Sequence, residues 1–82
     1  MKGNIAIGQI IRDELRRQGK SNRWLAERIN VNPRTVNKIF LKNTIDTQQL
    51  LLISRVLGVN FFLIYSEALA EADTADAEAK NS

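Results

Sequence analysis

Apolar residues recur every three or four positions along most of the chain, and no stretch alternates apolar and polar side chains as a strand would. The first apolar stripe consists of Ile7, Ile10, Ile11 and Leu15, with charged side chains on the opposite side. Gly19 follows and is suited to end a helix in the left-handed conformation. The segment is therefore predicted to be an amphipathic helix that ends before Gly19.

Two short helices joined by a tight turn are predicted for residues 21–40, SNRWLAERINVNPRTVNKIF. Ser21 is a good N-cap for the first of them, and its inner face consists of Leu25, Ala26 and Ile29. Asn30 stands where the turn requires a positive φ, which asparagine tolerates better than most residues.

The second of these helices is predicted over about residues 33–42. Asn32 caps it, and Pro33 occupies the first helical position, where a missing N–H costs nothing. At about 100° per residue, its apolar residues gather on one side and are expected to point into the core; they are Val36, Ile39 and Phe40.

Two further helices complete an all-α chain. Asp46 begins the fourth, with Gln49 three residues later at the spacing of a capping box, and Gly58 ends it. Its apolar stripe consists of Leu50, Ile53 and Leu57. Asn60 caps a fifth helix, so five short helices around one core are predicted.

The chain is predicted to divide into a folded domain over residues 1–69 and an acidic tail over residues 70–82. The tail sequence, AEADTADAEAKNS, has no apolar stripe. We expect it to be a frayed helix end or a disordered segment.

Composition argues against catalysis and cofactor chemistry. The chain has no cysteine and no histidine, which removes thiol nucleophiles, the commonest general base and the commonest metal ligands. No apolar run approaches the roughly 18 residues that span a bilayer, and no signal-peptide core follows the start. We expect a cytoplasmic protein that is not an enzyme, with no metal, cofactor, small-molecule ligand or membrane contact.

Charge is distributed unevenly along the chain. Residues 1–66 hold eleven Lys/Arg against four Asp/Glu, a net charge of +7, whereas residues 67–82 hold one Lys against five Asp/Glu, a net charge of −4. A basic body followed by an acidic segment is typical of a polyanion-binding domain, although a generic basic surface has the same composition.

The outer face of the helix over residues 33–42 carries side chains that can read base edges. Arg34 can bind guanine through two hydrogen bonds, Asn37 can pair with adenine, and Lys38 can reach guanine or a phosphate. Phosphate or supporting contacts are assigned to Lys20, Asn22, Arg23, Thr35, Lys42 and Asn43. The alternative is that these polar residues only solvate an exposed surface.

Two bulky side chains near this face have more than one interpretation. Trp24 can stack on nucleic acid, but packing as a half-buried side chain against the third helix is favoured. Leu41 can contact a thymine methyl or pack back onto the following loop.

At these residues the chain resembles the Cro/CI-type helix-turn-helix family of bacterial and phage repressors, also called XRE-type regulators. The resemblance covers about Ile7 to Tyr65 and includes the helix LLLISRVLGV at 50–59. The residues at the family's spacings are Ser21, Leu25, Ala26, Ile29, Val31, Thr35, Val36 and Ile39.

The resemblance implies a compact five-helix lambda-repressor-like domain that dimerises on a partly palindromic operator and places its third helix in the major groove. The family's first reading positions correspond to Pro33 and Arg34, and the later ones to Asn37 and Lys38. Asn22 corresponds to the second-helix residue that supports the first contact.

Three departures from the family pattern affect the base contacts more than the fold. Pro33 replaces a long polar side chain, which removes one base contact. Trp24 stands where an acidic residue is common, and Phe40-Leu41-Lys42 replaces a frequent acidic-basic-glycine ending.

Surplus apolar residues in the last two helices suggest a homodimer surface. Its candidate members are Leu52, Val56, Phe61, Phe62 and Tyr65. The alternative is that all of them close a small core.

Two functions from different classes fit the sequence. The first is a sequence-specific double-stranded DNA-binding transcriptional regulator, most simply a repressor, found at the nucleoid when bound. The alternative is a protein-interaction module, such as an antitoxin-like or partner-binding regulator, that keeps the helix-turn-helix as a scaffold.

Overall fold

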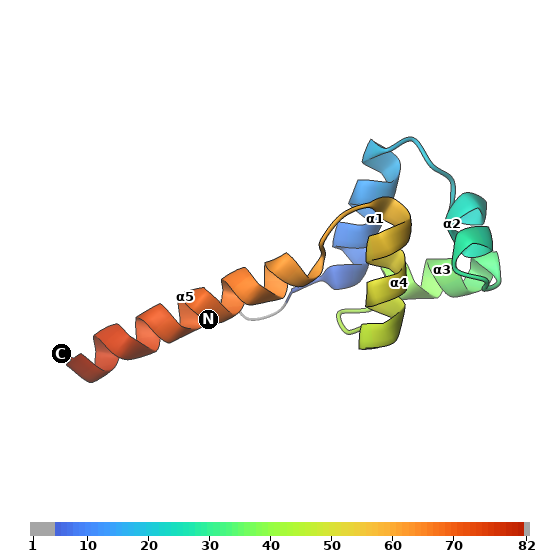
Figure 1. The fold of residues 1–82 in the computed structure, drawn as a ribbon. Helices are drawn as coiled ribbons and strands as arrows, with labels where there is room; N and C mark the ends of the chain where they lie inside the picture. Colours follow the sequence, from blue (N-terminus) through green and yellow to red (C-terminus); the bar gives the residue numbers. More distant parts are fainter. Residues whose placement is uncertain (1–4, 82) are drawn as a thin grey trace.

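Helices account for most of the computed structural model, which describes the backbone of residues 5–81 and the side chains of residues 5–71. In chain order they are α1 (Ile7–Arg17), α2 (Asn22–Arg28), α3 (Pro33–Phe40), α4 (Thr47–Leu57) and α5 (Phe62–Asn81). Residues 5–81 contain no strand, and the all-α, five-helix prediction is confirmed. Figure 1 shows α1 to α4 grouped together and α5 projecting away from them.

Helices α2, α3 and α4 begin at capping residues that the sequence predicts. The Ser21 hydroxyl accepts a hydrogen bond of 3.0 Å from the backbone N–H of Trp24 at the start of α2. The Asn32 side chain accepts one of 2.8 Å from the N–H of Arg34 at the start of α3. Asp46 does the same for the first turn of α4. Each bond satisfies a backbone donor that a helix end leaves free.

Left-handed residues end the helices where the sequence predicts them. Gly19 after α1 has a φ of 72°, Gly58 after α4 has a φ of 69°, and Asn30 in the turn after α2 has a φ of 58°. The chain can therefore reverse direction at these points with little steric cost.

α1 begins directly against the end of α3. The backbone N–H of Gly8 donates a 3.0 Å hydrogen bond to the carbonyl oxygen of Lys42, just beyond α3. A Cβ at Gly8 would overlap the carbonyl oxygen of Ile39 and lie 2.6 Å from that of Phe40. Glycine is therefore what allows α1 to lie this close to α3.

The end of α1 is joined to the end of α4 through polar side chains. Gln18 Nε2 donates to a Glu14 carboxylate oxygen at 2.7 Å and to the carbonyl oxygen of Leu57 at 2.9 Å. Arg17 forms an ion pair with the same carboxylate. The hydrogen bonds from Arg17 and then from Gln18 lower the pKa of Glu14 from 4.5 to about 2.

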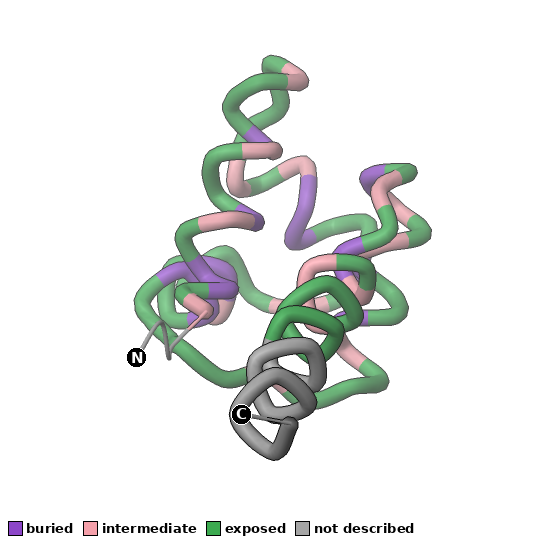
Figure 2. The backbone as a smooth tube through the Cα atoms, turned by 90° about the vertical axis from the view of Figure 1, so that its left-hand side faces the viewer, coloured by how far each residue is buried: buried purple, intermediate pink, exposed green. Residues whose placement is uncertain are grey.

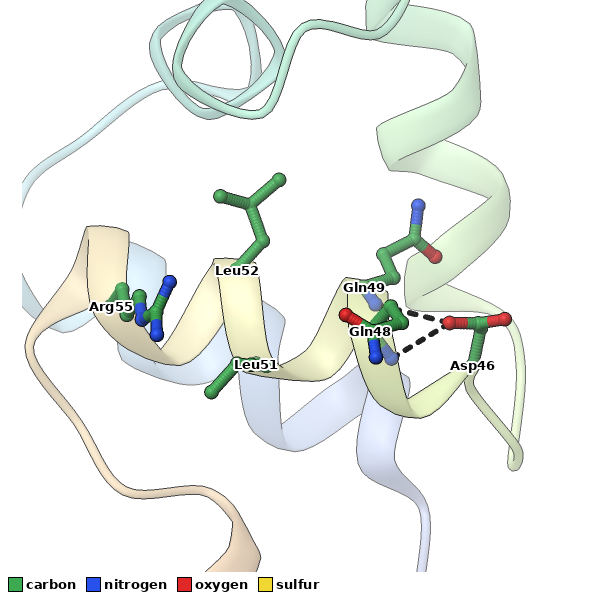
Figure 3. A pocket seen from close by; sticks show the side chains of 6 residues that line it. All are labelled: Asp46, Gln48, Gln49, Leu51, Leu52 and Arg55. Atoms are coloured by element: carbon green, nitrogen blue, oxygen red, sulfur yellow. Dashed lines mark hydrogen bonds between the residues drawn. The ribbon is translucent and has the colours of Figure 1, made fainter.

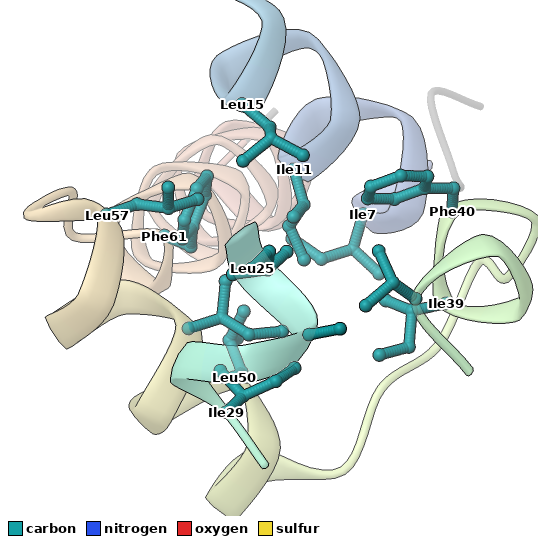
Figure 4. Close-up of a cluster of buried hydrophobic side chains, with 13 residues drawn as sticks. Ile7, Ile11, Leu15, Leu25, Ile29, Ile39, Phe40, Leu50, Leu57 and Phe61 are labelled. Atoms are coloured by element: carbon teal, nitrogen blue, oxygen red, sulfur yellow. The ribbon is translucent and has the colours of Figure 1, made fainter. Parts of the chain in front are cut away.

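One hydrophobic core lies between the helices and contains side chains from α1 to α4 together with Phe61. Buried stretches recur along the grouped helices (Figure 2), and the labelled core side chains point toward one another (Figure 4). Its members are Ile7, Ile11, Leu15, Leu25, Ala26, Ile29, Val36, Ile39, Phe40, Leu50, Ile53, Leu57 and Phe61. The predicted inner faces of the first four helices are therefore confirmed, except that Ile10 of α1 is only partly buried against the core.

α5 starts on this core and then leaves it. Phe62, Ile64 and Tyr65 are partly buried against the core, whereas Leu69 is exposed. The helix continues across the predicted boundary at residue 69 and ends at Asn81, which gives the molecule extents of 51 × 22 × 21 Å. The division into a domain and a tail stays a prediction.

Candidate nucleic-acid interface

The turn between α2 and α3 fixes how α3 is presented. The Val31 N–H donates to the carbonyl oxygen of Ala26 at 2.9 Å, which closes α2. The Thr35 N–H donates to the carbonyl oxygen of Asn32 at 2.8 Å, which opens α3. Because both helix ends are satisfied by local bonds, α3 is held against α2 across a short turn.

α3 has one buried face and one exposed polar face. Val36, Ile39 and Phe40 are buried in the core, as the sequence predicts. Arg34, Asn37 and Lys38 are exposed, and Thr35 is half-buried between the two faces. The exposed side chains supply both donors and an acceptor for hydrogen bonds, the groups that base edges require.

A chain of hydrogen bonds joins this exposed face to the two preceding helices. Arg16 Nη1 donates to Asn22 Oδ1 at 3.0 Å. Asn22 Nδ2 in turn donates to Asn37 Oδ1 at 2.7 Å. The structure therefore places Asn22 in support of Asn37, one turn further along α3 than the family pattern implies.

Arg16 is a residue that the sequence reasoning did not assign to the site. In the sequence it is one of several charged residues opposite the apolar stripe of the first helix. The signal that points to it is structural: α1 ends beside the start of α2, so a long side chain in its last turn reaches Asn22.

The remaining predicted phosphate contacts lie at exposed positions before and after α3 in the chain. Arg23, Lys42 and Asn43 are exposed. Lys20 is exposed as well, and its ammonium nitrogen lies 4.9 Å from the centre of the Trp24 ring.

Trp24 is half-buried and packs against the core, as predicted, whereas its contact with α3 stays a prediction. The guanidinium carbon of Arg28 lies 5.0 Å from its ring centre, and Lys20 is a second cation at the same ring. Cations at this distance are attracted by the electrons of the indole. The ring is therefore held within the protein surface by its own neighbours.

Leu41 directly follows α3 and is 82% exposed, so its side chain does not pack back onto the following loop. It lies beside the polar residues of α3 and leaves an apolar group at the end of the exposed face.

The proposed dimer surface loses one of its members in the structure. Phe61 is only 1% exposed and belongs to the core cluster, so its assignment to a surface is wrong (Figure 4). Leu52 is 39% exposed, and Val56, Phe62 and Tyr65 are half-buried.

Exposed leucines add to the apolar surface of α4 and α5. Leu51 and Leu52 border an open pocket on α4 together with polar residues of its first turns and Arg55 (Figure 3). Leu63 and Leu69 are exposed on α5. A second depression of about 370 Å³ lies between the loop before α4 and the start of α5; its lining includes Ile45, Leu50, Phe62 and Tyr65.

Residues 5–71 hold neither a cluster suited to a metal ion nor a single helix suited to crossing a membrane. This part of the chain holds no group of three acidic, cysteine or histidine side chains that could bind a metal ion. No single helix there has both the length and the apolar character to cross a membrane. α4 and the Phe62–Glu71 part of α5 meet that test only as a pair, and the chain bends by 116° between them.

Comparison with known proteins shows a protein family to which the chain is similar. A family model described as "Helix-turn-helix" matches residues 11–64, more than half of the chain. Searches of curated proteins and of solved structures give no match.

Proposed function

Because the chain belongs to the Cro/CI-type (XRE-like) helix-turn-helix family of DNA-binding regulators, we propose that it binds specific double-stranded DNA sequences and represses transcription by occluding a promoter. The observation that carries this proposal is the exposed polar face of α3, formed by Arg34, Asn37 and Lys38 over a buried apolar back. In this proposal α3 enters the major groove.

Each exposed residue of α3 has a role that follows from its chemistry. Arg34 presents a fork of N–H donors that matches the N7 and O6 acceptors of guanine. Lys38 reaches guanine or a phosphate as a single positive charge. Lys42 and Arg23 lie outside the reading face and contact the DNA backbone.

A homodimer binding a partly palindromic operator completes the proposal. One short helix contacts few base pairs, and two copies related by two-fold symmetry double the number that are read. The surface for this contact consists of Leu52, Val56, Phe62 and Tyr65. The protein would act in the cytoplasm, at the nucleoid.

Fluorescence anisotropy with duplexes selected from a random pool, compared with unselected duplexes, tests the proposal. We expect tight binding to the selected duplexes, with an affinity that falls steeply as salt rises because Lys and Arg contacts release counterions. Arg34→Ala should cost about 1–3 kcal/mol and relax the choice of base at one position, whereas Lys42→Ala should weaken all duplexes alike and lower the salt slope by about 1.

A protein-interaction module remains the second candidate, and the exposure of Leu41 beside the reading face favours it. In that case the exposed leucines of α4 and α5 would bind a partner protein. The same titration separates the two functions, because a scaffold would show no salt-sensitive, sequence-selective binding to DNA.

A further inference from the structure

The bonds joining Arg16, Asn22 and Asn37 run in one direction. Arg16 on α1 donates to Asn22 on α2 at 3.0 Å, and Asn22 donates to Asn37 on α3 at 2.7 Å. In this relay the Asn22 amide therefore turns its oxygen toward α1 and its nitrogen toward α3, and the Asn37 amide turns its oxygen toward α2.

The direction of the relay follows from the chemistry of arginine. A guanidinium has N–H donors and no acceptor, so the Asn22 amide must present its oxygen to Arg16. This orientation turns Asn22 Nδ2 toward Asn37, whose side-chain oxygen accepts the hydrogen bond. The Asn37 nitrogen is then the part of that amide left to face outward, and no described residue accepts a hydrogen bond from it.

On this basis we propose that Arg16 is a positioning residue that sets which base Asn37 reads, without contacting that base itself. The inference rests on the proposed function of α3 as a reading helix. An amide that presents two N–H groups matches guanine, whose major-groove edge carries two neighbouring acceptors, N7 and O6. An adenine contact would need Asn37 Oδ1 to accept a second hydrogen bond beside the one from Asn22, and so to use both of its lone pairs, whereas a guanine contact leaves that oxygen with one partner.

The relay also predicts what Asn37 disfavours. Cytosine presents a donor, its N4 amino group, at the major-groove edge. Two donors facing each other leave both unsatisfied, so cytosine at this position is the base most strongly rejected.

The experiment measures base preference at one position of a selected duplex. Asn37→Ala first identifies that position, as the one where substitution of the base no longer matters. Anisotropy titrations with all four bases there then compare the full-length wild-type chain with Arg16→Met, which keeps the length of the side chain and removes its donors.

We expect the wild-type chain to prefer guanine and Arg16→Met to lose about five-fold of that preference, the worth of one neutral hydrogen bond. Other positions should keep their preferences. Arg16→Lys, which again offers only donors, should restore the preference for guanine.

Asn22→Asp provides a second test, in which the base preference at the Asn37 position should change to another base instead of only weakening. A carboxylate accepts from Arg16 but cannot donate to Asn37, so the Asn37 amide should turn and present its oxygen outward. The preference should then move from guanine to a base with an exposed amino group, cytosine or adenine.

Arg12→Met is the matched control, because Arg12 is exposed one turn earlier on α1 and lies outside the relay. Losing its charge should leave the preference at the Asn37 position as in the wild type. In the free protein, a side-chain amide proton of Asn22 should exchange with solvent more slowly than those of Asn37, and Arg16→Met should reduce this protection.

Several results would overturn the inference. One is selective wild-type binding with no change of preference in Arg16→Met; another is an Arg16→Met loss that is equal for all four bases, as for a phosphate contact. If the wild-type chain selects no duplex, the proposed function fails first, while the amide exchange measurement still reports on the relay.

Discussion

A single position without a side chain decides how α1 meets α3. The Gly8 N–H bonds the Lys42 carbonyl oxygen, and the space beside its Cα is filled by the backbone carbonyls of Ile39 and Phe40. These carbonyls lie at the end of α3 and just beyond it, so a change at Gly8 is transmitted to the helix that carries Arg34 and Asn37.

Gly8→Ala is expected to lower the stability of the fold. Helix propensity alone would make alanine more stable by about 0.8–1 kcal/mol. The new Cβ meets backbone rather than a flexible side chain, and forcing it in should cost about 1–3 kcal/mol. We therefore expect a net lower urea midpoint and weaker DNA binding.

The control for this substitution is Gln9→Ala, at an exposed neighbouring position of α1 where propensity alone acts. It should leave the urea midpoint nearly unchanged. A Gly8→Ala protein as stable as the wild type would show that α1 does not need this close approach.

At the scale of elements, α1 and α4 are joined by a polar contact that depends on the charge of Glu14. Its carboxylate accepts from Arg17 and Gln18, and Gln18 also reaches the last carbonyl of α4. The contact is near solvent, so salt should weaken it.

The lowered pKa of Glu14 predicts how stability depends on pH. A group with a pKa of 4.5 when unfolded and about 2 when folded stabilises the fold fully above pH 4.5 and loses this contribution as the pH falls toward 2. Glu14→Gln should therefore flatten the pH dependence of the melting temperature between about pH 4.5 and 2.

Asp13→Asn is the control for this effect, because Asp13 is exposed on the same helix and makes no hydrogen bond in the described structure. Asp13→Asn should keep the wild-type slope of melting temperature against pH between about pH 4.5 and 2. The role of Glu14 would be refuted by wild-type and Glu14→Gln curves that fall in parallel.

Elements also show what the sequence could and could not predict. Caps and apolar stripes depend on residues close in the chain, so the start of α3 at Asn32-Pro33 and its buried face were predictable. Arg16, Gly8 and Phe61 act through contacts between helices, and their partners depend on how the helices cross. Local periodicity does not contain that geometry.

The candidate site follows the same division. Exposure of Arg34, Asn37 and Lys38 follows from the position of the core on the opposite side of α3, so these residues could be chosen from the sequence. The orientation of the Asn37 amide could not, because it depends on a donor from α1 and an amide from α2 meeting in space.

At the scale of the whole molecule, the arrangement separates the exposed polar face of α3 from the apolar surface of α4 and α5. α3 carries the exposed polar side chains, whereas exposed or half-buried apolar residues gather on α4 and the start of α5. Two copies joined through α4 and α5 could therefore each keep an α3 free for DNA, which makes the proposed homodimer compatible with the proposed reading helix.

Light scattering at micromolar concentration should then give a mass about twice the 9.3 kDa of one chain. Leu52→Glu should lower that mass toward one chain, because it places a charge in an apolar contact. Leu41→Glu, a matched change at an exposed leucine outside this surface, should not lower it. A wild-type mass of one chain at this concentration would count against the dimer.

The spacing of half-sites tests the same dimer on DNA. Two reading helices related by a two-fold axis face the same side of the duplex only when the half-sites lie about 10 base pairs, or a multiple, apart. Inserting about 5 base pairs between them rotates one half-site by half a turn, so we expect the affinity of the wild-type chain to fall to that of a single half-site. Leu52→Glu should bind the two duplexes equally, because a monomer cannot sense the distance between them. If the wild-type chain bound the duplexes with and without the insertion equally, each copy would read its half-site independently.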